Sequence, residues 1–226
     1  MTDHPPAPLS WTRDLRQRAR EHFWLKFIGT VVWVWVFFIG YFHLLRNPVY
    51  PVTVMPLTAV DRWMPFQPGW LAAYLSLWVY VGIAPGLQRG FASLLAYGFW
   101  SAALCATGLG IFWLWPTQIP PMDVPAGAPG FALLQGIDAA GNACPSMHVA
   151  ISMFTAVWLE SIFRRAGAPA ALRVLNLAWF AAIAWSTMAV RQHVLWDVLA
   201  GAALGAVFAW ASLRWRPAEP QVERLS

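Results

Sequence analysis

Two histidines and one aspartate carry the clearest chemical signal in the sequence. His193 and Asp197 are four residues apart, so in a helix they would lie on one face and within contact range. A carboxylate in that position can accept the Nδ1 hydrogen of the imidazole and leave Nε2 outward as a base or nucleophile. A structural His–Asp hydrogen bond at a polar helix end has the same spacing, and this motif alone leaves that alternative open.

The other histidine, His148, closes the segment Cys144-Pro145-Ser146-Met147-His148. Pro145 and Ser146 are typical of a helix start, with Ser146 as the N-cap. The free N–H groups of a helix's first turn attract anions such as phosphate, and His148 would stand in that turn. An ordinary capped helix with an interfacial histidine fits the same pattern.

The composition is that of a membrane protein. The 226 residues are 59% hydrophobic and only 11% charged, whereas soluble domains carry about 25% charged residues. The net charge is +5, but the basic residues stand in tails and loops between apolar runs and are not gathered on one polar face. We therefore expect a bilayer as the partner and no nucleic acid.

Six apolar segments are each near the length needed to cross about 30 Å of hydrocarbon. The first is long for a signal peptide and is not followed by a small-residue cleavage site, so we expect a spanning helix there. The sequence predicts an all-α, polytopic membrane bundle of six transmembrane helices at 24–213, between a basic, loosely ordered segment at 1–23 and a tail at 214–226. The helices are expected at about 24–45, 69–86, 91–115, 147–164, 171–190 and 193–213.

The basic residues predict the orientation of this bundle. Twelve of the fifteen fall before or at the start of the first segment, between the second and third, around the junction of the fourth and fifth, or after the sixth, and only Arg46, Arg62 and Arg191 fall on the other side. This asymmetry places both termini in the cytoplasm. The other side then receives the long connections at about 46–68 and 116–146. The second is rich in Pro and Gly and lacks Lys and Arg, and either a functional loop or a solvated spacer fits it.

The predicted topology brings the candidate catalytic residues to one membrane face, because the fourth and sixth helices both start there. His148 can therefore meet His193 and Asp197. Arg191 lies on that face too, and a guanidinium can clamp a phosphate through two hydrogen bonds. Two histidines, an orienting carboxylate, an arginine and a helix N-terminus suit phosphoryl transfer, in which positioning and charge neutralisation do most of the work.

Together these residues resemble the type 2 phosphatidic acid phosphatase superfamily, integral-membrane phosphatases and phosphotransferases with six helices. That family carries three signatures: a Lys/Arg–Pro segment, a Pro-Ser-x-His segment, and a Ser-Arg segment that ends in His-x-x-x-Asp. The resemblance spans about residues 24–213. The second signature matches at Pro145, Ser146 and His148, and the third matches at Ser186, His193 and Asp197.

The sequence departs from the family pattern at two places. Thr187 stands where an arginine is expected after Ser186, and the first signature is missing from the loop at 115–121, which holds no basic residue. This form is similar to the branch that includes relatives of inositol-phosphorylceramide and sphingomyelin synthases, in which the histidine segments persist while the phosphate-binding bases change. The stretch at 55–68 also looks like the segment before the second helix of that branch.

The resemblance implies a mechanism without a metal or other cofactor. His193, held by Asp197, attacks phosphorus and forms a phosphohistidine, while His148 protonates the departing lipid alkoxide. Ser146, Ser186 and Arg191 are the expected phosphate-binding residues. Water as the acceptor makes the protein a phosphatase, and an alcohol acceptor makes it a phosphotransferase. The expected substrate is a lipid phosphate or lipid-linked phosphate, reached from the outer leaflet of a bacterial inner membrane, with the site facing the periplasm or exterior.

Two other classes of protein stay open from the residues alone. Two histidines and one aspartate resemble the facial triad of a metal site, which a chelator would inactivate. A transporter or lipid-binding membrane protein could use the histidine pair as a proton relay, although the repeat symmetry typical of transporters is not visible in the sequence. His43 and Glu160 are interpreted as interfacial residues near helix ends. The sequence makes no prediction of the oligomeric state.

Overall fold

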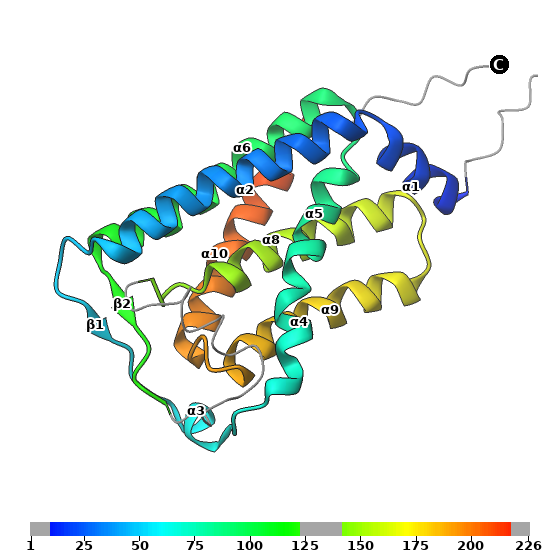
Figure 1. Ribbon diagram of the computed structural model, residues 1–226. Coiled ribbons are helices and arrows are strands. Elements are labelled where there is room, and N and C mark those ends of the chain that lie inside the picture. The colour runs from blue at the N-terminus through cyan, green and yellow to red at the C-terminus, as the bar shows by residue number, and fades with distance from the viewer. Residues whose placement is uncertain (1–9, 123–141, 218–226) are drawn as a thin grey trace, which may run out of the picture.

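The structure is a computed structural model that describes residues 10–122 and 142–217, and most of its regular elements are helices (Figure 1). In chain order the elements are α1 (Trp11–Arg20), α2 (Phe23–Arg46), β1 (Thr53–Val54), α3 (Ala59–Trp63), the short 3-10 helix η1 (Pro68–Trp70), α4 (Leu71–Leu75), α5 (Leu77–Gly86), α6 (Gly90–Leu114), β2 (Thr117–Gln118), α8 (Met147–Arg165), α9 (Ala170–Ala189) and α10 (Leu195–Arg214).

All six predicted apolar segments form helices, and their bounds agree with the prediction to within two residues. Among the described residues, five helical segments are long and apolar enough to cross a membrane, namely Phe23–Arg46, Pro68–Gly86, Gly90–Leu114, Ala170–Ala189 and Leu195–Arg214. The predicted fourth span, α8, has 19 residues but is less apolar than these five. Two of its polar side chains, Ser152 and Thr155, are fully buried against protein.

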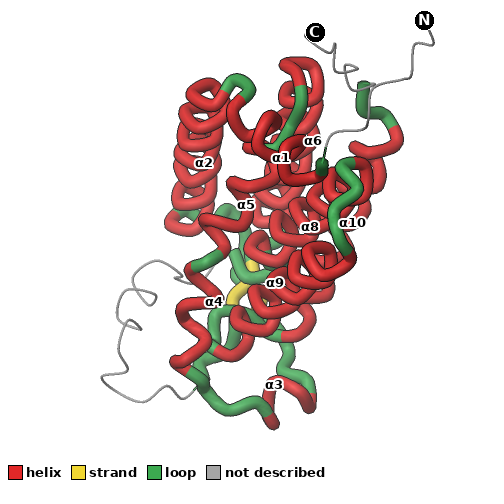
Figure 2. Tube along the Cα trace, turned by 90° about the vertical axis from the view of Figure 1, so that its right-hand side faces the viewer, coloured by secondary structure: helices red, strands yellow, loops and turns green. Residues whose placement is uncertain are grey.

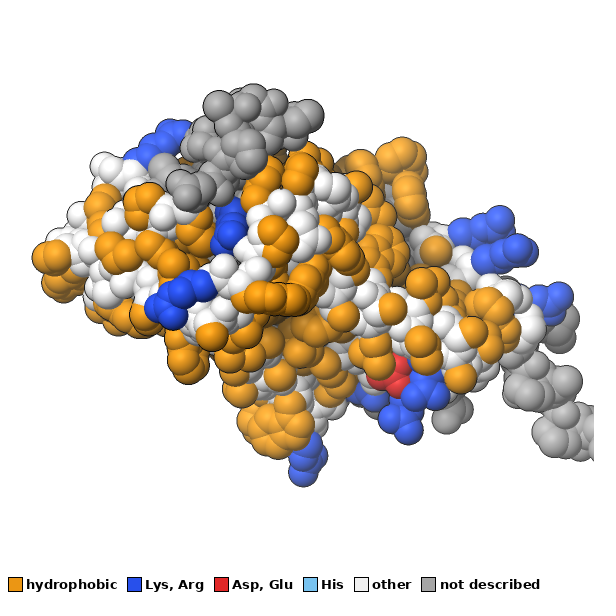
Figure 3. All heavy atoms as spheres, turned by 90° about the horizontal axis from the view of Figure 1, so that it is seen from below, with side chains coloured by type: hydrophobic (Ala, Val, Ile, Leu, Met, Phe, Trp, Pro, Cys, Tyr) orange, Lys and Arg blue, Asp and Glu red, His pale blue; other side chains and the backbone are white. Residues whose placement is uncertain are grey.

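Helix α8 lies inside the bundle, where it contacts α10, α9, α5 and α6. The outer helices turn large apolar side chains outward, for example Trp35, Trp210 and Val207, which are all more than half exposed. Hydrophobic side chains cover most of the face seen in Figure 3, with basic side chains scattered over it and few acidic ones. An apolar exterior around a more polar interior helix suits a bundle surrounded by lipid.

Two glycines let α8 and α10 approach closely. Gly201 and Gly205 are four residues apart, so they share one face of α10. A Cβ atom at residue 201 would collide with the carbonyl oxygen of Ser146, and one at residue 205 would collide with the carbonyl oxygen of Ala150. Small residues at this spacing permit close helix packing in membranes. The first turns of α8 and α10 are therefore held side by side.

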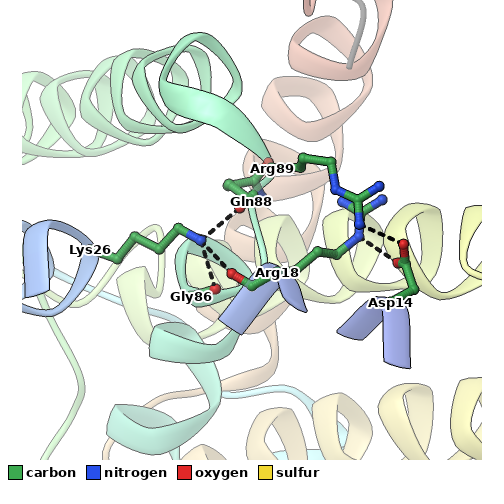
Figure 4. Close-up of polar contacts among 6 residues, drawn as sticks. All are labelled: Asp14, Arg18, Lys26, Gly86, Gln88 and Arg89. Carbon is green, nitrogen blue, oxygen red and sulfur yellow. Dashed lines mark hydrogen bonds and ion pairs between the residues drawn. The ribbon is translucent and has the colours of Figure 1, made fainter. Parts of the chain in front are cut away.

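The N-terminal segment is more ordered than the sequence predicts, because α1 has polar partners elsewhere in the chain. Asp14 forms ion pairs with Arg18 at 2.7 Å and with Arg89, in the turn between α5 and α6, at 2.6 Å. Lys26 Nζ donates to the carbonyl oxygens of Arg18, Gly86 and Gln88 (Figure 4). The expectation of a loosely ordered tail was thus wrong for residues 11–20, and we call these contacts the Lys26 cluster (Asp14, Arg18, Lys26, Gly86, Gln88 and Arg89).

The connections at the opposite end of the bundle form a small structured cap, which the sequence does not predict. Strands β1 and β2 pair in parallel, with Thr53 opposite Thr117, and Asn142 extends this pairing through a bridge to Thr117. Helix α3 lies at this end, far from α1 in both ribbon views (Figures 1 and 2). The starts of α8 and α10 meet here, so this end of the bundle positions the candidate catalytic residues His148, His193 and Asp197.

Candidate active site

His193 lies in the turn before α10, one residue ahead of the N-cap, Val194. The expectation that His193 and Asp197 share a helix face was therefore wrong: only Asp197 is helical. The two side chains still face each other, with His193 Nδ1 3.5 Å from Asp197 Oδ2. This distance is longer than a hydrogen bond, and catalytic contacts of this kind often shorten when a ligand binds. His193 is 6% exposed and Asp197 is fully buried.

The turn that carries His193 is fixed by backbone contacts at the end of α9. The carbonyl oxygen of Thr187 accepts hydrogen bonds from the N–H groups of Gln192 at 2.9 Å and His193 at 3.1 Å. Arg191 adopts a left-handed conformation with φ of 59°, which is uncommon for a residue other than glycine. Its guanidinium donates to the carbonyl oxygens of Asp61 and Met64, and these bonds hold the turn against the segment around α3.

Two carboxylates occupy the N-terminus of α10. Asp197 Oδ2 accepts from Val194 N at 3.0 Å, and Asp61 Oδ1 accepts from Leu195 N at 2.9 Å. Negative side chains are favourable at this end of a helix dipole. The backbone N–H groups at the start of α10 therefore donate to carboxylates of the protein itself. The hydrogen bond from Val194 N also holds Asp197 beside His193.

Helix α8 begins as the sequence predicts, with Ser146 as its N-cap and His148 in its first turn. Ser146 Oγ accepts from Val149 N at 3.4 Å. The N–H of Ser146 donates to the carbonyl oxygen of Asp197 at 2.9 Å, so one backbone hydrogen bond joins the two histidine segments. The imidazole rings of His148 and His193 have centroids 5.6 Å apart. The structure thus brings together His148, His193 and Asp197, which we call the histidine site.

The predicted phosphate-binding side chains make their contacts elsewhere. Ser186 Oγ donates to the carbonyl oxygen of Ile183 inside α9, at 2.6 Å, and is fully buried. Arg191 is bonded to the carbonyls of the α3 segment as described, although its buried Nε has no partner among the described residues. Ser146 Oγ caps its own helix. The polar groups of these three side chains are thus engaged with the protein itself, and their assignment to phosphate binding stays a prediction.

Sequence reasoning missed Tyr74 and Asn142, which both lie close to the histidine site. Tyr74 Oη forms a hydrogen bond with His148 Nε2 at 2.9 Å, and its ring packs on the imidazole with centroids 4.8 Å apart. Tyr74 belongs to α4, 74 residues before His148, and no spacing in the sequence relates the two. Asn142 lies near the end of the Pro- and Gly-rich loop at 116–146, and only the interpretation of this loop as functional pointed toward it.

A cavity of about 100 Å³ opens beside the two histidines. Both imidazoles and Asn142 line it, and most of its other lining residues are apolar, among them Trp33 and Phe37 of α2 and Trp78 of α5. A mostly apolar cavity with a few convergent polar groups is typical of a small-molecule site.

The thiol of Cys144 lies close to Asp197, the carboxylate that also faces His193, and it is unreactive. Burial and the nearby charge of Asp197 raise the pKa of the Cys144 thiol to about 12. The thiol is therefore neutral at neutral pH, and a neutral thiol is a poor nucleophile. Among residues 10–122 and 142–217, no group of three His, Cys, Asp or Glu side chains is placed to hold a metal ion.

The chain was compared with known protein families, curated proteins and solved structures. A model of the PAP2 superfamily matches residues 92–221, more than half of the chain. The matched region runs from α6 to beyond α10 and contains His148, His193 and Asp197. No curated protein and no solved structure matches the chain significantly.

Proposed function

Because the chain belongs to the PAP2 superfamily, whose members are phosphatases and phosphotransferases, we propose that it hydrolyses a lipid phosphate through a phosphohistidine on His193. The observation that carries the proposal is the pairing of the two imidazoles, 5.6 Å apart between ring centroids, with Asp197 behind only one of them. This arrangement gives the two histidines different roles. A histidine beside a carboxylate is set up as a nucleophile, and the second histidine acts as the proton donor and acceptor.

In the first step, His193 Nε2 attacks phosphorus and the bond from phosphorus to the lipid oxygen breaks. His148 in its charged form gives its proton to that oxygen, so the lipid alcohol leaves neutral. In the second step, water attacks phosphorus, His148 takes a proton from the water, and the electron pair of the N–P bond returns to His193. Covalent catalysis divides one hard displacement into two, and the proton transfers typically contribute about 10²–10⁴-fold.

The cavity supports a lipid as the substrate. Aromatic side chains of α2 and α5 line it together with both histidines, and α2 is one of the outer helices, with most of its apolar side chains exposed. Burial of a hydrocarbon chain against such walls is favourable, at roughly 25 cal/mol per Å² of apolar surface removed from water. A water-soluble phosphate ester would gain little from them.

The proposal also covers the number of membrane spans and the orientation of the bundle in the membrane. Six helices span the membrane, with α8 as the internal one, and both termini face the cytoplasm. The basic residues of α1 and those at the ends of α8 and α10 lie at the end opposite the histidine site, as the positive-inside rule requires. The histidine site then faces the periplasm or exterior of a bacterial inner membrane, and the lipid reaches it from the outer leaflet.

Headgroup transfer to an alcohol is the second candidate, and one observation favours it. The three basic residues at the histidine end are engaged elsewhere: Arg191 with backbone carbonyls, Arg62 with the carbonyl of Leu57, and Arg46 over the ring of Phe42. A phosphodiester carries one negative charge and needs less neutralisation than a dianionic monoester. A panel of lipid monophosphates, diphosphates and phosphodiesters, with and without alcohol acceptors, separates the two activities.

The phosphohistidine is tested with labelled lipid phosphate and protein purified in detergent. We expect acid-labile, base-stable label on the wild type, none on His193→Ala, and slow labelling of His148→Ala. His43→Ala is a matched control, because His43 is an exposed histidine of α2, and it should behave as the wild type. Turnover should persist in a chelator and be inhibited by vanadate. Wild-type turnover by folded His193→Ala would show that the nucleophile is wrongly assigned.

A further inference from the structure

Asn142 is a buried polar residue that the mechanism above does not use. It directly precedes the Ala143–Ser146 segment that leads into α8, and its backbone is held by the bridge to Thr117, whose carbonyl oxygen accepts from Ala143 N at 3.0 Å. Its side chain reaches across to α2, where Nδ2 donates to the carbonyl oxygen of Tyr41 at 2.9 Å. The residue is 5% exposed, so its amide group is fixed in place.

The contact with Tyr41 decides which way the amide points. A carbonyl oxygen only accepts hydrogen bonds, so the nitrogen of Asn142 must face Tyr41, and Oδ1 faces away. Oδ1 is buried and has no hydrogen-bond partner among the described residues. A buried acceptor without a donor is costly and uncommon in folded proteins, so Oδ1 has the capacity to accept a hydrogen bond from a ligand.

The cavity beside the histidines supplies the place for that donor. Asn142 lines it together with His148 and His193. A volume of about 100 Å³ is ample for a water molecule where polar partners are present. The oxygens of a dianionic phosphate monoester accept hydrogen bonds and do not donate them, so the substrate's phosphoryl group in this form does not satisfy Oδ1. A hydroxyl group can, and the reaction uses one: that of the acceptor in the second step.

We propose that Asn142 Oδ1 accepts a hydrogen bond from the attacking water and thereby selects water over simple alcohols. The inference rests on the phosphohistidine of the proposed function. As the water oxygen bonds to phosphorus, one of its hydrogens passes to His148, the N–P bond breaks, and the pair returns to His193. The second hydrogen stays on the oxygen and donates to Asn142 Oδ1.

The preference for water follows from the number of O–H groups that each acceptor carries. A monohydric alcohol has a single O–H, which must go to His148, so it leaves Asn142 Oδ1 without a donor. Water has a second O–H for this oxygen, and a 1,2-diol has a neighbouring hydroxyl that can reach it. Asn142 therefore makes the site prefer water first and diols second, which favours hydrolysis over transfer to simple alcohols.

The test measures how the phosphohistidine divides between acceptors. Asn142→Leu keeps the size of the side chain and removes both polar atoms. With a lipid monophosphate and added methanol, we expect hydrolysis to slow by about tenfold, the factor for one hydrogen bond lost from a transition state. The ratio of methyl phosphate to inorganic phosphate should rise by about the same factor. The first-turnover rate of phosphohistidine formation should not change, so the phosphorylated enzyme accumulates.

Gln88→Leu is the matched control. Gln88 is also a fully buried amide, with Nε2 donating to the carbonyl oxygen of Ala84 at 2.9 Å and Oε1 without a partner among the described residues, but it belongs to the Lys26 cluster at the other end. The same substitution there should leave the product ratio unchanged. Wild-type enzyme gives a second readout: ethylene glycol should be a better acceptor than methanol at equal hydroxyl concentration.

The outcomes distinguish a failure of the role of Asn142 from a failure of the proposed phosphohistidine mechanism. An unchanged product ratio in folded Asn142→Leu overturns the role of Asn142. If that variant does not fold, equal use of methanol and ethylene glycol by the wild type overturns it instead. A wild type that forms no phosphohistidine contradicts the proposed function itself, whereas phosphohistidine formation with an unchanged ratio contradicts only the role of Asn142.

Discussion

The Lys26 cluster and the histidine site lie at opposite ends of the bundle, and both bury polar side chains. In the Lys26 cluster the charged groups are matched: Lys26 Nζ has three carbonyl acceptors, and Asp14 receives two guanidinium groups. At the histidine end, buried atoms without a partner accumulate. Of eight such atoms among the described residues, five lie there, on Asn142, Arg191, Gln192, His193 and Asp197.

This difference separates a structural polar cluster from one that is prepared for a ligand. A matched buried charge lowers the cost of its own desolvation, and its loss weakens the fold. An unmatched buried atom costs stability and is retained where it serves binding or chemistry. Variants at the two ends should therefore fail in different ways, at the histidine site through rate and at the Lys26 cluster through stability.

Asp197→Asn gives the largest expected effect. The amide oxygen can still accept from Val194 N, so the start of α10 should be kept and thermal unfolding should change little. Loss of the charge removes the group that orients His193, and the rate of phosphohistidine formation should fall by about 10³–10⁴-fold, as for the equivalent change in a serine protease triad. A near wild-type rate in this variant would show that Asp197 is a structural residue. The contrast between the histidine site and the Lys26 cluster would then not hold.

Lys26→Met should show the opposite behaviour. The side chain is 4% exposed, and its loss leaves three carbonyl oxygens without their donor, so we expect the free energy of unfolding to fall by about 3 kcal/mol. Turnover at a temperature well below unfolding should be unchanged. Arg13→Met on the exposed side of α1 is the control and should affect neither quantity. Reduced kcat in folded Lys26→Met would show that the two ends are coupled.

Tyr74→Phe is the smallest of these effects and sharpens the comparison within the histidine site. It keeps the ring that packs on His148 and removes the hydroxyl that bonds to Nε2, so kcat should fall by about tenfold with little change in KM. As a positioning residue for His148, Tyr74 should also shift the limb of the pH–rate profile that reports His148. Tyr50→Phe, at an exposed tyrosine, should change neither. An unmoved pH profile would limit Tyr74 to packing.

The sequence predicted those parts of the molecule that depend on local pattern. Apolar runs located all six helices, and Ser146 marked the start of α8. Close packing of His148 and His193 followed from topology. The position of His193 outside α10 was not predictable, because Asp61, more than 130 residues earlier, shares in capping that helix with Asp197. Tyr74 and Asn142 also act through contacts between distant segments, which periodicity does not report.

The order of α1 shows the same limit at the other end. Its composition alone favours a solvated tail, and the partner that orders it, Arg89, lies 75 residues away from Asp14. Arg191 was placed on the correct turn, but its contacts with the carbonyls of Asp61 and Met64 depend on how the α3 segment folds back. Long-range polar contacts thus decided the details that the motifs left open.

The Lys26 cluster also has a consequence for how the chain is made. Lys26 stands at the start of α2, yet two of its three acceptors, Gly86 and Gln88, follow 60 and 62 residues later. Synthesis runs from the N-terminus at roughly 5–20 residues per second. For some seconds, therefore, the start of α2 has no buried partner for its ammonium group. The Lys26 end of α2 can be locked only after the segment from Gly86 to Gln88, at the end of α5, has been synthesised and has packed beside it.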